Sequence, residues 1–323
     1  MMQTIVYEHE SQRFDREIRF EEISDVVKEP RNLVWIDVEK PTAEEMQKLQ
    51  HELALHPLSV EDVLHGHQRP KIDEYEGYFF VVANALRYDT ANVSLELTEI
   101  DFFIGRNYVV TVHDGTCKAM DEALTRARAH PRVFEEGLGL LVYTIMDAII
   151  DEYMPILDLL DEKIDSIEEG IFNHFEAEAI NVIFRLKREM LKVRRSVGHM
   201  RDVFNILARR DQPLFSSHAV LYFQDIYDHL YRITDAIDIY RDTLTSALEA
   251  YVSLNANKLN EIMKVFGGIS IILMTAALIA GIYGMNFQYM PELHWSHGYP
   301  SAMGLMVVLG LAELVIFKRK GWL

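Results

Sequence analysis

The sequence predicts an α+β protein joined to a membrane region: an N-terminal α/β domain, a long helical stalk and two C-terminal transmembrane helices. The segment Val265–Tyr283 is about nineteen residues without a charge, which is long enough for a helix to cross a bilayer. A second apolar run, Tyr299–Leu311, continues past Glu313 and ends at Lys318–Lys320. The chain before Lys264 is polar in composition, which is typical of a water-soluble part.

Composition excludes several classes of partner. The 323-residue chain has a formal charge of −18 at pH 7, which argues against nucleic acid because phosphates attract basic surfaces. No glycine-rich phosphate loop occurs, which argues against an ATP-driven machine. We also expect no nucleotide, no organic cofactor and no enzymatic activity. The single cysteine, Cys117, excludes an internal disulfide and indicates a reducing compartment. The N-terminus is too polar for a signal peptide, so we expect the soluble part to be cytoplasmic.

The charges beside the two apolar runs predict their orientation. Lys258 and Lys264 precede the first run, and Lys318–Lys320 follow the second. The connecting turn, Asn286–Gly298, contains no Lys or Arg. By the positive-inside rule, both ends then face the cytoplasm and the turn faces outward. This predicts a multi-pass protein of the inner (plasma) membrane that contacts lipid. Glu313 is only about a turn from Lys318, so we expect it to snorkel or to pair at the cytoplasmic interface instead of acting in transport.

The first 135 residues have the pattern of a mixed α/β domain. Apolar or alternating runs predict strands at Thr4–Tyr7, Leu33–Val38, Tyr78–Tyr88, Val93–Ile104 and Tyr108–His113. Gly105-Arg106-Asn107 predicts a tight hairpin turn between the last two of these. Helices are expected after Thr42, from Pro57, and from Cys117 to His130, where Pro131 ends the last one.

From Gly137 onward the pattern is helical. One acidic helix containing Asp147 through Glu169 and one basic helix containing Arg185 through Arg201 are expected, with a break near Gly170–Phe175. An antiparallel hairpin of these helices would pair opposite charges; alternatively, the acidic face concentrates divalent cations near a pore exit.

Pro213 ends this hairpin, and the chain from about Ser217 to Tyr283 predicts one helix of about 65 residues. Its apolar residues keep a heptad spacing in two rows: Ile226, Ile233, Tyr240, Ala247 and Leu254, and Leu230, Ile237, Leu244 and Tyr251. The partner of this seam is either another copy of the chain or the preceding hairpin. The predicted segments are therefore the α/β domain 1–135, the helical hairpin 136–213, the stalk 214–264, the first span 265–285, the external loop 286–298, the second span 299–318 and the basic tail 319–323.

Small and weakly polar side chains share one face of the first span. They recur at steps of three and four residues: Asn260, Met263, Gly267, Ser270, Met274, Ala277 and Gly281. Such a stripe indicates close helix packing in lipid or, alternatively, the wall of a narrow water-filled path with Met263, Phe266 and Met274 as constrictions. One hairpin cannot enclose a path, so the second interpretation needs a ring of identical subunits.

The sequence after the first span resembles a known signature. Tyr283-Gly284-Met285-Asn286-Phe287 and the following Met290-Pro291-Glu292-Leu293 resemble the signature and acidic outer loop of CorA-type magnesium channels. His67–Lys71, Tyr222–His229 and Lys318–Leu323 also resemble that family, and these motifs occur in the same order over most of the chain. Mg²⁺ gives up water reluctantly, so a neutral amide oxygen at Asn286 suits contact with its hydration shell.

The resemblance implies a homopentamer with a funnel-like cytoplasmic part that admits Mg²⁺, and also Co²⁺ and Ni²⁺, as the membrane potential drives the ion inward. It implies a selectivity filter at Gly284, Met285 and Asn286, and a regulatory site between subunits where Mg²⁺ bound by Asp89 and Asp225 closes the pore. Glu292 would concentrate cations at the outer mouth. The alternatives are a zinc transporter of the same superfamily, and a membrane-anchored metal sensor without transport.

Overall fold

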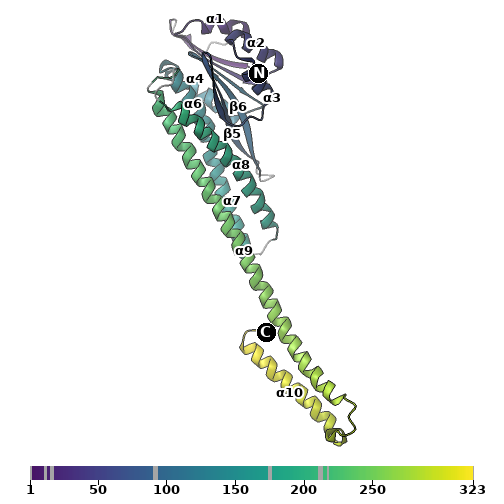
Figure 1. Ribbon diagram of the computed structural model, residues 1–323. Helices are drawn as coiled ribbons and strands as arrows, with labels where there is room; N and C mark the ends of the chain where they lie inside the picture. Colours follow the sequence, from purple (N-terminus) through teal and green to yellow (C-terminus); the bar gives the residue numbers. More distant parts are fainter. Residues whose placement is uncertain are drawn as a thin grey trace. The chain divides into compact units, whose positions relative to one another are not determined.

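The computed structural model describes residues 2–10, 13–14, 18–89, 94–173, 177–209, 214–216 and 218–322 (Figure 1). The chain forms two compact units, Met1–Ala247 and Leu248–Leu323. Helix α9, Ala219–Tyr283, contributes residues to both units. Its 65 residues confirm the single long helix that the sequence predicts, although Pro213 and Ser217 lie outside the described residues.

A seven-stranded sheet organises the first unit. Its order is β2-β1-β3-β7-β6-β5-β4, in which β3 and β7 run parallel and the other neighbouring strands run antiparallel. The strands are β1 (Met2–Glu8), β2 (Arg13–Phe14), β3 (Leu33–Glu39), β4 (Lys71–Tyr75), β5 (Tyr78–Asp89), β6 (Ser94–Ile104) and β7 (Tyr108–His113). All five predicted strands are confirmed, except that Val93 lies outside the described residues. The short strands β2 and β4 were not predicted, because neither has a continuous apolar pattern.

Helices lie on both faces of the sheet (Figure 1). On one face are α1 (Ile23–Val27), α2 (Ala43–Leu53) and α3 (Pro57–His65), preceded by the short helix η1 (Phe20–Glu22). Their buried residues, such as Met46 and Leu49, pack with Val34, Ile36 and Val110 of the central strands. On the other side are α4 (Lys118–Ala129), α5 (Arg132–Glu135) and α6 (Leu138–Asp151). Because both faces of β3 and β7 are covered, these strands consist of continuous apolar runs instead of alternating ones.

A buried polar chain lies at the ends of β3 and β7. The indole Nε1 of Trp35 donates to Thr111 Oγ1 (3.0 Å), and the Thr111 hydroxyl donates to Asp37 Oδ1 (2.5 Å). His113 Nε2 lies 3.3 Å from Asp37 Oδ2, and both side chains are buried. Burial alone would lower the pKa of His113, but the hydrogen bond and the charge of Asp37 raise it, so the pKa lies above its ordinary value.

This pair makes stability depend on pH in a defined direction. Since the pKa of His113 is raised on folding, its contribution is complete below the unfolded value of about 6.5 and is lost as pH rises through the folded pKa. We expect His113→Gln to lower the free energy of unfolding by on the order of 1–3 kcal/mol at pH 6 and by less at pH 8.5. Thermal unfolding of the purified full chain at both pH values measures this, with the exposed His130→Gln as a control. A cost for His113→Gln that is independent of pH would contradict the assignment.

The acidic stretch expected as one helix is two helices, and that prediction was wrong. Helix α6 ends at Asp151 and α7 begins at Tyr153 (Tyr153–Asn173). The break precedes Pro155, whose ring would collide with the carbonyl of residue 151 in a continuous helix and which has no N–H to donate to it. Helix α7 is described as far as Asn173 and α8 (Ala177–Leu207) from Ala177 onward. The break expected near Gly170–Phe175 is not found between 170 and 173, and its remaining part lies outside the described residues.

The helices α7 and α8 bury apolar side chains, including Leu160, Ile164, Leu186 and Val193. Several of their expected charge partners lie on other helices. Arg194 of α8 makes a bidentate pair with Asp238 of α9, at 2.5 Å and 2.9 Å. On α6, the carboxylates of Asp147 and Asp151 pair with Arg126 of α4. These ion pairs join α8 to α9 and α6 to α4, so the pairing of opposite charges between the two helices of the hairpin stays a prediction.

One residue of β5 connects the sheet to both helices of this hairpin. The side-chain amide of Asn84 donates to Ser196 Oγ of α8 (2.7 Å). Its backbone carbonyl accepts a hydrogen bond from the hydroxyl of Tyr153, at the start of α7 (2.7 Å). All three residues are buried, so these hydrogen bonds form in a region that excludes water.

The first half of the heptad seam packs within the chain. Its residues from Ile226 to Ala247 are buried except Tyr240, which is half-buried. Lys187 of α8 donates to Thr245 Oγ1 (2.5 Å), which places α8 beside this part of α9. At the start of α9, a Cβ on Gly139 of α6 would lie 2.4 Å from Cβ of Ala219, so the close approach of the two helices requires glycine. Of the two partners left open for the seam, the preceding helices are confirmed for residues 226–247.

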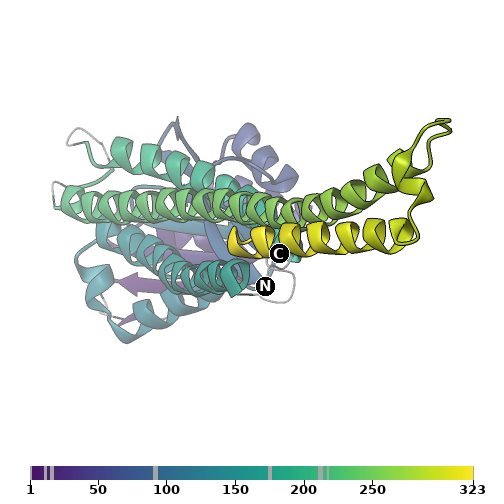
Figure 2. The same cartoon turned by 90° about the horizontal axis from the view of Figure 1, so that it is seen from below.

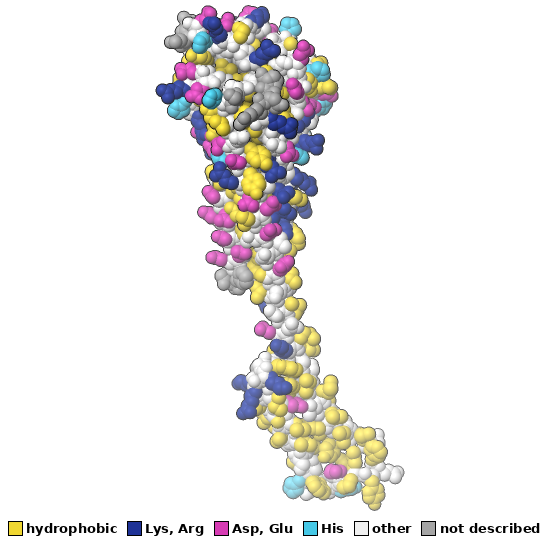
Figure 3. Space-filling view, turned by 60° about the vertical axis from the view of Figure 1, so that its left-hand side comes forward, with side chains coloured by type: hydrophobic (Ala, Val, Ile, Leu, Met, Phe, Trp, Pro, Cys, Tyr) yellow, Lys and Arg dark blue, Asp and Glu magenta, His cyan; other side chains and the backbone are white. Residues whose placement is uncertain are grey.

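The second unit is a helical hairpin of the C-terminal half of α9 and α10 (Gly298–Arg319), which lie side by side (Figure 2). A short helix, η2 (Pro291–His294), lies in the loop between them. Both α9 and α10 are long and apolar enough to cross a membrane. Hydrophobic side chains cover the visible face of the hairpin (Figure 3), as expected for a surface in contact with lipid.

Glu313 of α10 turns toward α9 instead of snorkelling to the interface, which corrects the prediction for this residue. The hydroxyl of Thr275 donates to Glu313 Oε1 (2.7 Å), and Glu313 Oε2 is buried with no hydrogen-bond partner among the described residues. Nearby, a Cβ on Gly310 would lie 3.6 Å from Ile272 Cγ2, so α10 packs on the face of α9 that carries Ile272 and Thr275.

We expect Thr275→Val to destabilise this hairpin. The substitution keeps the shape of the side chain and removes the donor, so Glu313 Oε1 also loses its partner and neither carboxylate oxygen is paired in this apolar region. Polar contacts between membrane helices contribute about 0.6–2 kcal/mol, so a loss of about 1 kcal/mol is expected. Thermal unfolding in detergent measures it, and Thr275→Ser, which keeps the hydroxyl, should behave as wild type. Equal stability of Thr275→Val and Thr275→Ser would show that the hydrogen bond contributes nothing.

Candidate functional site

The predicted filter lies where α9 ends. The helix ends at Tyr283, and its last turn closes with Gly284 N donating to Ala280 O (2.9 Å) and Met285 N donating to Ile282 O (3.3 Å). A Cβ at position 284 would lie 3.2 Å from Ala280 O, closer than side chains normally approach, so glycine suits this turn. Asn286 follows at an exposed position. A helix C-terminus carries the negative end of the helix dipole, so this end of α9 attracts cations.

The stripe predicted on the first span is not the surface that α10 covers. Met263, Phe266 and Met274 are 66%, 69% and 69% exposed, whereas Gly268 and Ile279, on other faces of α9, are buried. The remaining members of the stripe are exposed at Asn260, Ala277 and Gly281 and half-buried at Gly267 and Ser270. Close packing within the hairpin therefore does not explain the stripe. In the single chain this face is open to lipid, to water or to further subunits.

Glu292, the predicted acidic residue of the outer loop, lies in η2 and is exposed. The loop is tight at this point, since a Cβ on Gly298 would lie 2.4 Å from Glu292 O. Its carboxylate is thus presented from a compact loop at the same end of the hairpin as Asn286.

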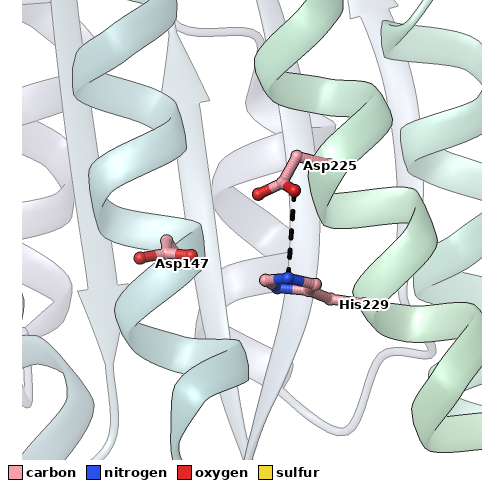
Figure 4. A group of neighbouring side chains, drawn as sticks. All are labelled: Asp147, Asp225 and His229. Carbon is pink, nitrogen blue, oxygen red and sulfur yellow. Dashed lines mark ion pairs between the residues drawn. The ribbon is translucent and has the colours of Figure 1, made fainter.

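A second set of residues forms a candidate metal site in the first unit. Asp147 of α6 and Asp225 and His229 of α9 each place one ligand atom within 4.8 Å of the others (Figure 4). The hydroxyl of Tyr143 donates to Asp225 Oδ2 (3.0 Å), and His229 Nε2 lies 3.9 Å from Asp225 Oδ1. Carboxylate and imidazole groups at these separations can share one divalent ion with water completing its coordination.

Two groups at this site, Asp147 and Tyr143, have raised pKa values, chiefly because of burial and in part because of nearby carboxylates. Burial raises the pKa of Asp147, and the charge of Asp151 raises it further, against the effect of Arg126. The pKa of Tyr143 is also raised, first by burial and then by Asp147 and Asp225. A bound cation would relieve this repulsion, because it stabilises the ionised carboxylates.

The two predicted regulatory residues are not in one group within this chain. Asp225 belongs to the candidate metal site, while Asp89 is the last residue of β5, opposite Ser94, and is not a member of that group. Asp147 and His229 were not predicted as candidate ligands. Asp225 and His229 are four residues apart, which places both side chains on one face of a helix, so the sequence could have predicted this pair. Asp147 has no such signal, because only the packing of α6 against α9 brings it there.

Comparisons with known proteins agree with the two apolar helices and the signature after α9. Residues 31–319 match the family described as CorA-like Mg²⁺ transporter protein. The cobalt/magnesium transport protein CorA of Thermotoga maritima is 36% identical over 279 residues, which are 86% of this chain and 80% of that protein. The CorA of Methanocaldococcus jannaschii is 29% identical over 91% of this chain and 93% of that protein. The complete structure of that transporter superposes with a TM-score of 0.84 and covers 99% of both chains. The chain therefore belongs to the CorA-like Mg²⁺ transporter family and is a membrane protein of the magnesium and cobalt transport class.

Proposed function

We propose that this chain is the subunit of a homopentameric channel that carries Mg²⁺ into the cell and also admits Co²⁺ and Ni²⁺. The proposal rests on the exposed stripe of α9, which α10 does not cover. The stripe runs toward the C-terminal end of the helix at Tyr283, and Asn286 follows directly after that end. One hairpin cannot enclose a path, and a closed ring of identical copies is the simplest arrangement that brings these stripes together. The family resemblance supports five copies.

In this arrangement Asn286 selects the ion. Mg²⁺ demands octahedral oxygen ligands and dehydrates reluctantly, so a ring of amide oxygens can hold the hydrated ion without binding it tightly. The negative end of α9 at Gly284 adds to the attraction. Below this ring Met274, Phe266 and Met263 form apolar constrictions, and Glu292 in the outer loop raises the local concentration of cations.

The membrane potential supplies the driving force. Each unit charge gains about 2.3 kcal/mol per 100 mV, so a divalent cation gains about 4.6 kcal/mol on crossing an inside-negative membrane. Inward transport then needs no nucleotide. The proposed location is the inner membrane with both ends of the chain in the cytoplasm, supported by the positive charges beside the two spans.

Because inward flow is downhill, the channel needs a signal to close. We propose that cytoplasmic Mg²⁺ binds at Asp225, with Asp147 and His229 as neighbouring ligands and Asp89 supplied by the adjacent copy. Bound ions would bridge the subunits and hold the path shut. Without them, repulsion between carboxylates would favour a splayed, open arrangement. The proximity of Asp147, Asp225 and His229 supports this proposal.

Reconstituted vesicles that contain a Mg²⁺-sensitive dye test the transport function. An imposed inside-negative potential should drive Mg²⁺ entry, and dissipating the potential should stop it. A channel-free sensor would give no flux under either condition. A preference for Zn²⁺ over Mg²⁺ in the same vesicles would favour the zinc transporter instead.

A further inference from the structure

The α/β domain contains a polar cavity that the proposed channel does not use. Its volume is about 710 Å³, and it lies between the C-terminal end of α3 and the middle of β6, from Leu97 to Asp101. Leu64, His65 and Gly66 line it from the helix side, and Glu99 and Asp101 line it from the sheet. The cavity is separate from the Asp225 group, none of whose members lines it.

The strand geometry explains why two carboxylates enter this cavity together. Successive side chains of a strand point to opposite faces, so Glu99, Asp101 and Phe103 of β6 share one face. Phe103 belongs to the apolar core between the sheet and helices α1 to α3, together with Val112 of β7. Asp101 and Glu99, which precede Phe103 by two and four residues, place carboxylates on the same face of β6. The cavity therefore begins where the apolar core ends.

Two oxygen atoms in the cavity lack partners among the described residues. Asp101 is 4% exposed, and its Oδ1 is fully buried without a hydrogen bond. Glu99 Oε2 accepts a hydrogen bond from the backbone N–H of Gln68 (2.6 Å), but Glu99 Oε1 is also buried and unpartnered. A buried polar group without a partner costs free energy, so such atoms indicate a missing partner. Both atoms are acceptors, so the missing partner is a cation or a donor.

The carboxylates in the cavity favour a cation, although Lys40, His65, His67 and His113 also line it. The charges of Glu99 and Asp62 repel the charge of Asp101, which is buried. Lys71 opposes this effect, but its ammonium already pairs with Asp62 (2.6 Å) and Asp73 (2.8 Å). The C-terminal end of α3, which carries the negative end of its dipole, also borders the cavity at Gly66.

We propose that Glu99 and Asp101 hold a hydrated divalent cation in this cavity, as a metal site of the α/β domain distinct from the Asp225 group. Magnesium is commonly bound through one or two carboxylates and keeps several of its waters. The two unpartnered oxygens supply such ligands, and the cavity has room for the waters. An ion without water would need several protein ligands close together. Among the described residues such a group of three is found at Asp225 and not in this cavity, so the ion proposed here keeps its water.

Binding of Mn²⁺ to the purified full chain, followed by electron paramagnetic resonance, tests the proposal without a transport assay. We expect Asp101→Asn to bind one fewer Mn²⁺ per chain than wild type. Glu99→Gln should lose the same single ion, so the double variant should lose no more than either one. The matched control is Glu96→Gln, since Glu96 is an exposed carboxylate on the same strand that pairs with Arg87. It should bind as many ions as wild type.

A second pair of variants separates this site from the channel's own metal sites. Asp225→Asn should remove a different Mn²⁺, so Asp101→Asn combined with Asp225→Asn should lose both. If only Asp225→Asn loses a Mn²⁺ ion, the cavity site is wrong and the regulatory site stands. If only Asp101→Asn loses one, the cavity site stands and the regulatory site is wrong. If Asp101→Asn unfolds at the same or a higher temperature with an unchanged Mn²⁺ count, the two carboxyl groups share a proton and the proposal is wrong.

Discussion

Asn286→Ala should abolish Mg²⁺-selective flux in reconstituted vesicles while the oligomer still assembles. The substitution removes one amide oxygen from each copy at the end of α9, where we propose the selectivity filter. A hydrogen bond of this kind contributes about 1 kcal/mol, so a ring of five loses several kcal/mol. Because 1.4 kcal/mol corresponds to about tenfold, flux should fall at least about a hundredfold. Dye-loaded vesicles measure the flux, and size-exclusion chromatography measures assembly.

The neighbouring Gln288→Ala is the matched control for this experiment. It removes an amide from the same exposed loop and leaves the Gly284–Asn286 turn intact, so flux should stay near that of wild type. Asn286→Asp provides a second test, because a ring of carboxylates should bind divalent ions tightly and slow their release. Wild-type flux through Asn286→Ala would remove Asn286 from the filter, even if the chain remains a transporter.

Asp225→Lys should weaken closure by cytoplasmic Mg²⁺. Its ammonium would lie beside Asp147 and His229, repel a metal ion and lose the hydrogen bond from Tyr143. We expect the Mg²⁺ concentration that halves the flux to rise at least about tenfold, which corresponds to about 1.4 kcal/mol of lost binding. Vesicles with a graded internal Mg²⁺ concentration measure this curve.

Asp228→Lys is the control for charge alone, because Asp228 is exposed on the same helix and is not a member of the metal group. It should close at the same Mg²⁺ level as wild type. The milder Asp147→Asn should shift the curve in the same direction as Asp225→Lys. An Asp225→Lys channel that closes at the wild-type level would refute a regulatory role for this residue, whatever its rate of transport.

Local sequence patterns predicted most of the elements correctly. The five longer strands have enough consecutive apolar residues to be recognised, and the absence of proline between 214 and 290 revealed the length of α9. The break before Tyr153 was missed although Pro155 is visible, because the acidic residues on both sides keep a helical spacing across it. Strand β4, Lys71–Tyr75, could not be recognised because it is a polar edge strand that depends on pairing with β5.

The candidate sites were less predictable where they depend on packing. Gly284, Met285 and Asn286 are consecutive in the chain, so the sequence alone was enough to place them at the end of a helix. Asp147 reaches Asp225 only because α6 packs beside α9, and Glu313 reaches Thr275 only because α10 packs on one particular face. Neither contact has a sequence spacing from which to predict it. For the same reason the cavity at Asp101 became visible only in the folded domain.

The two hydrogen bonds of Asn84 limit how the first unit can deform. Because one residue of β5 is tied to both α7 and α8, the sheet cannot slide along either helix without exposing a buried amide or carbonyl. Each such rupture costs about 1–3 kcal/mol, which disfavours shear between these layers. Asn84 also lines the cavity that contains Asp101. A group bound there that displaced Asn84 would therefore affect α8 through the Asn84 side chain and α7 through the Asn84 carbonyl.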